Sequence, residues 1–124
     1  MAATKSTTVI QNSVTLSAGG GPTTTSSASV ATGFGASLFL KITNGATAPT
    51  TQATARIEVS PDGTNFYDLN GGTEDLNGGT TNADVTSNHF ELPIGIQSVR
   101  IVATHGDDQD ITIRSEVSDI TAVA

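Results

Sequence analysis

The segment Ala55–Leu69, which reads ARIEVSPDGTNFYDL, constrains the fold of this chain most strongly. Its first six residues alternate, which places Ala55, Ile57 and Val59 on one face of a strand and Arg56, Glu58 and Ser60 on the other. The PDG sequence that follows supplies the fixed φ, the side-chain acceptor and the permissive residue of a tight turn. The segment therefore predicts a β-hairpin of a small all-β domain.

Further strands are predicted by the same alternation in the rest of the chain. In residues 36–43, Leu38, Leu40 and Ile42 face one way, and similar patterns occupy residues 85–92, 98–104 and 110–117. Turn residues separate these runs at fairly regular spacing. We expect an antiparallel β-sandwich or jelly roll of about seven to eight short strands, with an extended N-terminal arm.

The N-terminal segment is predicted to lie apart from the sandwich. Residues 4–17 alternate at Val9, Val14 and Leu16 but are otherwise polar, and a Gly-rich stretch follows. We expect residues 1–22 to form an arm and a loop, and residues 23–124 to form the sandwich. Such an arm is suited to reach across an interface, so its three apolar residues are interface candidates.

A tandem near-duplicate, DLNGGTE followed by DLNGGTT, occupies residues 68–81. Two short glycine-rich copies are too few for a solenoid. We interpret this segment as a long exposed loop.

Composition and charge limit both the fold and the partners of this chain. The chain has 124 residues, 35% of them hydrophobic, with 4% aromatic residues and neither Trp nor Cys, so one domain with a lean aliphatic core is expected. A formal charge of −7 argues against binding to nucleic acid or to anionic lipid. Residues 1–20 contain no apolar block of signal-peptide length, so we expect no secretion signal, and no stretch has membrane-spanning length.

Few residues suggest chemistry. Asp107, Asp108 and Asp110 crowd one turn and are the candidate Ca²⁺ ligands, but their spacing fails the EF-hand pattern and a solvated hairpin tip is preferred. His89 and His105 lack partners at metal-ligand spacing. With no recognisable catalytic constellation, we expect neither an enzyme nor a cofactor.

Two aromatic residues, Phe39 and Tyr67, are predicted to point away from the main core face. An outward aromatic residue is either covered by a second sheet or used at an interface. We interpret Tyr67 as an interface residue.

The hairpin and a later strand resemble the small β-sandwich structural proteins of tailed bacteriophage virions. The resemblance covers roughly residues 30–120 and rests on the patterns S-x-DGT-x-aromatic-x-x-L and x-VR-x-x-x-T, matched here by Ser60, Asp62, Gly63, Thr64, Phe66, Leu69, Val99, Arg100 and Thr104. The aromatic position is usually Trp in such proteins and is Phe66 here. The resemblance implies no catalytic residue.

The resemblance implies a structural protein of a phage virion and does not distinguish the capsid from the neck or tail. We expect a non-enzymatic capsid decoration or cement protein, made in the host cytoplasm and carried on the virion. Its expected partners are the major capsid protein or other virion proteins and further copies of itself, a trimer being favoured. The alternatives are a neck or tail component of the phage and a monomeric carbohydrate-binding or adhesion module. With no Trp and one Tyr, aromatic platforms for sugars are scarce.

Overall fold

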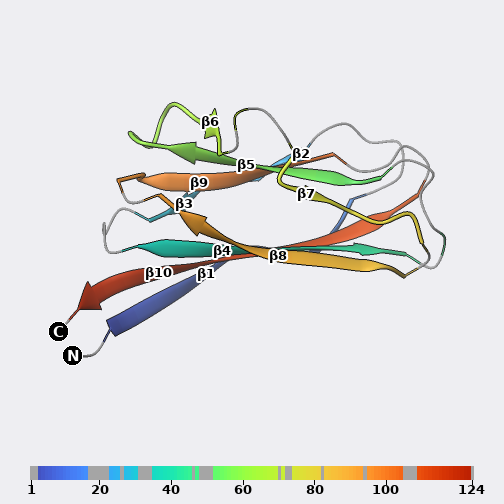
Figure 1. The fold of residues 1–124 in the computed structure, drawn as a ribbon, viewed down its shortest axis with the longest axis horizontal. Coiled ribbons are helices and arrows are strands. Elements are labelled where there is room, and N and C mark those ends of the chain that lie inside the picture. The colour runs from blue at the N-terminus through green and yellow to red at the C-terminus, as the bar shows by residue number, and fades with distance from the viewer. Residues whose placement is uncertain are drawn as a thin grey trace.

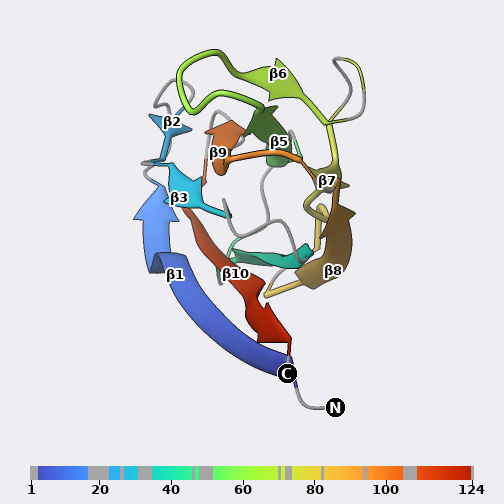
Figure 2. The same ribbon diagram turned by 90° about the vertical axis from the view of Figure 1, so that its left-hand side faces the viewer.

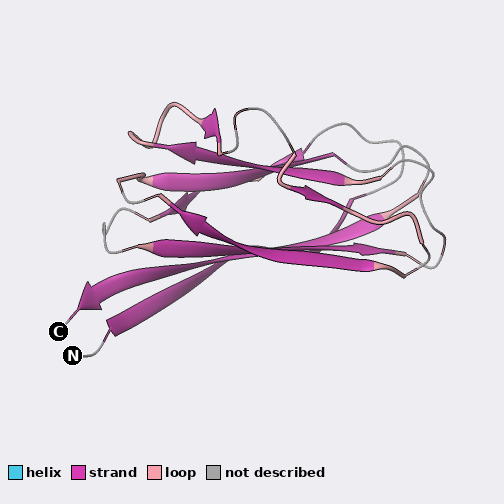
Figure 3. Cartoon of the chain, in the orientation of Figure 1, coloured by secondary structure: helices cyan, strands magenta, loops and turns pink. Residues whose placement is uncertain are grey.

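The chain folds into two antiparallel β-sheets that face each other, as Figures 1 and 2 show. The computed structural model describes residues 3–16, 23–25, 27–30, 35–45, 47, 52–69, 71, 74–81, 83–93, 95–104 and 109–123. All regular structure in these ranges is strand (Figure 3), and none of them contains a helix that could cross a membrane. The predicted all-β sandwich is confirmed.

The first sheet, sheet A, contains the long strands. Its order is β1 (Ala3–Leu16), β10 (Ile111–Val123), β4 (Ala36–Asn44) and β8 (Val85–Leu92). Sheet B has the order β2 (Thr23–Thr24), β9 (Ser98–Thr104), β5 (Thr54–Ser60) and β6 (Tyr67–Asp68). In addition, β3 (Ala28–Ser29) pairs with β9, and β7 (Leu76–Asn77) pairs with β5.

Aliphatic side chains from both sheets fill the space between them. The residues with almost no exposed surface are Leu38, Leu40 and Ile42 of β4, Ile111, Ile113 and Val117 of β10, Ile57 of β5, and Val99 and Ile101 of β9. They occupy alternate positions, as the sequence predicts. The chain buries these residues without a single fully buried aromatic side chain among the described residues.

The prediction of a separate N-terminal arm is wrong, because β1 belongs to the sandwich. It pairs with β10 from Ala3, opposite Val123, to Leu16, opposite Ile111. Leu16 is 6% exposed and lies in the hydrophobic core. The polar composition of β1 reflects its place at the edge of sheet A, where three register shifts and a positive φ at Ser13 also occur.

The predicted hairpin is confirmed, with one correction. Val59 of β5 pairs with Tyr67 of β6, so the chain reverses as expected. Ser60, expected on the polar face, is fully buried, and its hydroxyl accepts the N–H of Gly63 at 2.8 Å. Ser60 is therefore part of the turn, since the hydrogen bond to Gly63 satisfies its buried oxygen.

The carboxylate of Asp62 organises the same turn. Its Oδ1 accepts the backbone N–H groups of Thr64 and Asn65, both at 2.8 Å, and its Oδ2 accepts the side-chain amide of Asn65 at 2.8 Å. These hydrogen bonds hold the pKa of Asp62 far below its usual range. Gly63 follows with φ of +80°, a conformation that favours glycine.

The segment expected as an exposed loop instead covers an edge of sheet B. Leu76 is buried, Asp75 donates its N–H to the Ala55 carbonyl at 2.9 Å, and the Asp75 Oδ2 accepts the Ile57 N–H at 2.6 Å. Leu69 donates its N–H to the carbonyl of Ile57 at 2.9 Å. The free edge of β5 is thereby satisfied by β6, β7 and one carboxylate.

The core predicts the cost of removing a central side chain. Ile57→Ala should lower the free energy of unfolding by about 2–5 kcal/mol, because the truncation leaves a cavity between the sheets. Val85→Ala, at a position that is 54% exposed, should change it by less than about 0.5 kcal/mol. Urea denaturation of the two variants checks this, and equal losses would contradict the assignment of the core.

The Asp62 turn predicts a pH dependence of stability. Because the folded pKa is depressed, the stabilisation is present above the unfolded pKa of about 3.9 and is lost as pH falls below it. The difference in urea midpoint between the natural chain and Asp62→Ala should shrink between about pH 5 and pH 2. A difference that stays constant over this range would show that the Asp62 carboxylate does not stabilise the fold.

Candidate functional site

The outer face of sheet A is built on the four longest strands that the structure describes. On β4, the residues between the buried Leu38, Leu40 and Ile42 point away from the core, and the same alternation holds on β10. The Cα register places their partners on β1 and β8 on the same side of the sheet. We call this surface the A face; it comprises Lys5, Thr7, Val9, Ser37, Phe39, Lys41, Thr43, Val85, Ser87, His89, Glu91, Arg114, Glu116 and Ser118.

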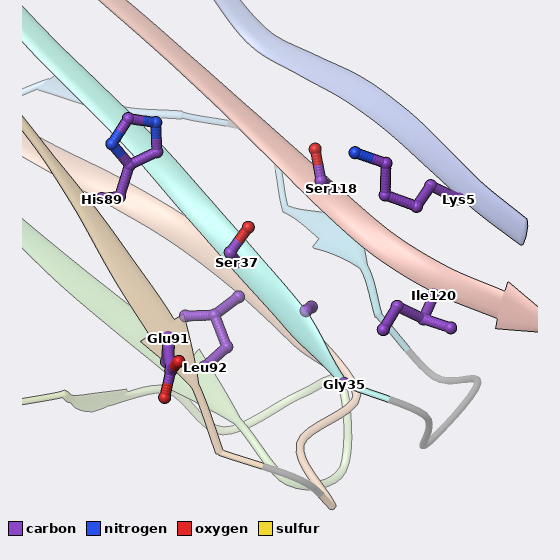
Figure 4. A pocket seen from close by; sticks show the side chains of 9 residues that line it. Lys5, Gly35, Ser37, His89, Glu91, Leu92, Ser118 and Ile120 are labelled. Carbon is purple, nitrogen blue, oxygen red and sulfur yellow. The ribbon is translucent and has the colours of Figure 1, made fainter. Parts of the chain in front are cut away.

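One end of the A face is hollowed. A depression of about 540 Å³ is lined by Lys5, Gly35, Ala36, Ser37, His89, Glu91, Leu92, Ser118 and Ile120. Figure 4 shows Ser37 of β4 between His89 and Glu91 on β8 and Ser118 and Lys5 on the other side. A second depression of about 310 Å³ continues past Ser37, Ser118 and His89 to Phe39 and Glu116. All four strands of sheet A thus contribute to one shallow groove.

A ring pair lies where the two depressions meet. Phe39 on β4 and His89 on β8 are direct cross-strand neighbours, with ring centroids 4.8 Å apart and planes inclined by 44°. His89 also lines both depressions, so one wall of the groove is an aromatic surface with polar nitrogen atoms. Cross-strand pairs of this kind hold both side chains in place.

Charged groups surround the ring pair. The guanidinium of Arg114 lies 3.0 Å from the Glu116 carboxylate and donates a hydrogen bond to the side chain of Asn12. Lys5 and Lys41 form no ion pair within the described part of the chain. The groove therefore offers ammonium, carboxylate and hydroxyl groups beside an aromatic surface, which suits binding to a polar ligand.

The backbone edge beside the groove is protected by a side chain. The Oδ1 of Asn88 accepts the N–H of its neighbour His89 at 2.9 Å. Within the described ranges β8 pairs only with β4, so this N–H would otherwise be available to an added strand. This hydrogen bond occupies one backbone donor of the β8 edge at the point where the edge borders the groove.

The outer face of sheet B has a different character, since its charges are matched. Glu58 lies 2.7 Å from the Nε of Arg100 and 3.2 Å from a terminal nitrogen of Arg56. Burial alone would raise the pKa of Glu58, but the two guanidinium groups outweigh it and lower the pKa below its usual value. The Nε of Arg56 lies 2.7 Å from Asp68, although its N–H is not aligned for a hydrogen bond.

Phe66 completes this second cluster. The guanidinium carbon of Arg100 lies 4.0 Å from the centroid of the Phe66 ring, which places the cation over the ring face. The aromatic residue of the hairpin pattern thus packs against a charged strand residue. These contacts fix the hairpin to β9, and they pair the charged side chains of this cluster with one another.

The predicted site residues lie apart from one another. Val9 is 44% exposed on the A face, Tyr67 is 60% exposed on β6, and Leu16 is in the core. The side chain of Val14 lies outside the described residues, although its backbone pairs with Ile113. Phe39 does point away from the core, as predicted.

No metal centre is found in the part of the chain that the structure describes. No group of three His, Cys, Asp or Glu side chains there could hold an ion. Asp107, Asp108 and His105 lie outside the described residues, and Asp110, immediately before β10, is exposed. His89, for which the sequence indicates no metal-ligand partner, contacts the ring of Phe39.

The comparisons with known proteins agree with the fold. Residues 40–117, more than half of the chain, match the family described as F5/8 type C domain. No curated protein sequence matches significantly.

Several solved structures share the architecture. They include the infectious bursal disease virus Gx strain (TM-score 0.58, 18% identity, 94% of this chain, 31% of that chain). A VP2 subviral particle of infectious bursal disease virus gives a TM-score of 0.56 with 17% identity over 96% of this chain and 33% of that one. Dimeric latent PorU from Porphyromonas gingivalis gives a TM-score of 0.56 with 7% identity, over 95% of this chain and 13% of that one. The chain spans a third or less of these proteins, and at such identities the likeness shows the fold alone.

The ring pair predicts a measurable coupling. In a double-mutant cycle of Phe39→Ala, His89→Ala and the double variant, we expect an interaction free energy of about 0.5–1 kcal/mol from unfolding curves. Thr43→Ala with Val85→Ala, another cross-strand pair of β4 and β8, provides a reference without rings. A coupling no larger than that of the reference would show that the rings do not stabilise each other.

Proposed function

Because this chain belongs to the F5/8 type C domain family, we propose that it is a non-enzymatic binding module, and that it serves as a decoration protein of a virus particle. The A face supports the role of a binding module. Its groove is built across four strands, so it can bind a ligand without changing shape. The F5/8 type C domain and the viral capsid proteins that share this architecture have non-catalytic folds, which supports a binding role.

Two observations support a place on a virion. The hairpin and the VR strand resemble small β-sandwich structural proteins of tailed phages, and the sandwich itself is a domain architecture found in the VP2 capsid protein. Many copies that each make modest contacts would hold a shell together by avidity. In this proposal the capsid protein and further copies of the chain are the partners, and the trimer is the favoured oligomer.

Val9 is the residue through which association is best tested. It is a large exposed hydrophobic side chain on edge strand β1, where a neighbouring copy has access to it. Val85 is similarly exposed on the opposite edge strand, β8, and so provides a matched control. Tyr67, at 60% exposure on sheet B, is a second contact candidate.

Light scattering tests the oligomer. The purified chain should have the mass of a trimer, and Val9→Asp should raise the dissociation constant by at least tenfold, because a carboxylate would be buried in the interface. Val85→Asp should leave the mass unchanged. A monomer at all concentrations would overturn the self-associating decoration protein.

A second candidate function, carbohydrate binding, is favoured by the ring pair in the groove. Domains of this family often bind carbohydrate, and the aromatic surface that composition made scarce is supplied by Phe39 and His89 side by side. The hydroxyl groups of Ser37 and Ser118 and the carboxylate of Glu91 line the same groove. These groups can exchange hydrogen bonds with sugar hydroxyls while a ring covers the apolar face of a sugar.

A further inference from the structure

The positive charges of the chain are unevenly distributed between the two sheets. Both lysines, Lys5 and Lys41, lie on the A face, together with Arg114. Arg114 is matched by Glu116, which leaves Lys5 and Lys41 against one further carboxylate on the A face, that of Glu91. The remaining carboxylate of these strands, Asp119 on β10, lies on the buried side of the sheet. The A face therefore has a net positive charge although the whole chain has a formal charge of −7.

The arginines of sheet B do not contribute a similar excess. Arg56 and Arg100 are held by Glu58 and Asp68 at distances of 2.7 to 3.2 Å. An anionic ligand is thus repelled by most of this acidic molecule and attracted at one surface. This difference in electrostatic potential extends over a Debye length, about 10 Å at moderate salt, and orients an approaching ligand.

The two lysines lie on opposite sides of the ring pair. Lys41 follows Phe39 by two residues on β4, about 7 Å farther along the strand. Lys5 lies toward the other end of the groove, where it lines the larger depression with His89 (Figure 4). A ligand that covers the rings therefore has an ammonium group available on each side.

The other side chains favour a sugar polymer over a protein surface. The core of a protein interface is apolar, whereas the centre of the A face carries Ser37, Ser118 and charged residues. Val9 and Val85, its large exposed aliphatic side chains, stand on opposite edge strands and form no common patch. Hydroxyl groups beside aromatic rings suit a hydroxylated ligand.

We propose that the A face binds an acidic polysaccharide, with a sugar ring against Phe39 and His89 and carboxylate groups near Lys5 and Lys41. The proposal rests on the second candidate function above and adds the charge of the ligand and the residues that select it. Lys5 and Lys41 are the specificity-determining residues, and the ring pair contacts the sugar whatever its charge.

Titration calorimetry with matched polymers tests this inference. Polygalacturonate is the probe, its carboxyl-reduced neutral form is the uncharged counterpart, and polyglutamate presents carboxylates without sugars. The natural chain should bind polygalacturonate at least tenfold more tightly than the other two polymers. The double variant Lys5→Gln/Lys41→Gln should lose about tenfold in affinity for polygalacturonate, and added salt should reduce the difference.

Control variants distinguish an effect of the lysine charges on binding from a loss of folding stability and from the loss of a positive charge elsewhere on the molecule. Arg56→Gln removes one positive charge from sheet B and should leave the affinity within twofold. His89→Ala should weaken binding of the acidic and the neutral polymer alike. The unfolding midpoint of each variant is measured first, so that only folded protein is compared.

The remaining outcomes distinguish failure of the acidic-polysaccharide proposal from failure of carbohydrate binding as such. Equal binding of the acidic and the neutral polymer would overturn the selection by charge and leave carbohydrate binding in place. Equal binding of polyglutamate would show that charge alone is recognised and would overturn the sugar contact. Binding of none of the three would overturn the inference, and carbohydrate binding would then depend on a neutral sugar such as galactose binding to the same groove.

Discussion

The close contact between the two sheets is the constraint on which the rest of this structure depends. With four Phe, one Tyr and no Trp in the whole chain, the core must be closed by small aliphatic side chains. Leu38, Leu40 and Ile42 of β4 face Ile57 and Ile101 across this layer. Because side chains alternate along a strand, burying these residues forces Phe39 and Lys41 outward. The A face is therefore a consequence of the core.

Much of the fold follows from the sequence, and the reason is visible in particular residues. The alternation in β4, β9 and β10 and the PDG turn are local signals, and the structure confirms them. The place of β1 is not local, because its polar composition suits an edge strand as well as a detached arm. Only the pairing with β10 and the burial of Leu16 distinguish the two. The place of the repeat near Leu76 is not local for a similar reason, because the burial of Leu76 and the hydrogen bonds of Asp75 to β5 depend on a strand elsewhere in the chain.

The candidate site was less predictable than the fold. Phe39 could be assigned to the outer side of a strand, and His89 could be assigned to another strand, fifty positions later. Their contact depends on the register between β4 and β8, which no turn specifies because many residues separate the two strands. Lys5 joins them only because β1 is part of the sheet. A surface assembled from four strands thus becomes apparent only when the strand order is known.

The protection of the sheet edges has a consequence for crowding. Edge strands commonly let folded domains join into continuous ribbons when their local concentration is high. Here β1 is irregular at three points, the outward N–H of His89 on β8 is occupied by Asn88, and β5 is covered by two short strands. Each of these features leaves a second copy fewer regular backbone groups to pair with, and so disfavours the growth of fibres by addition of strands.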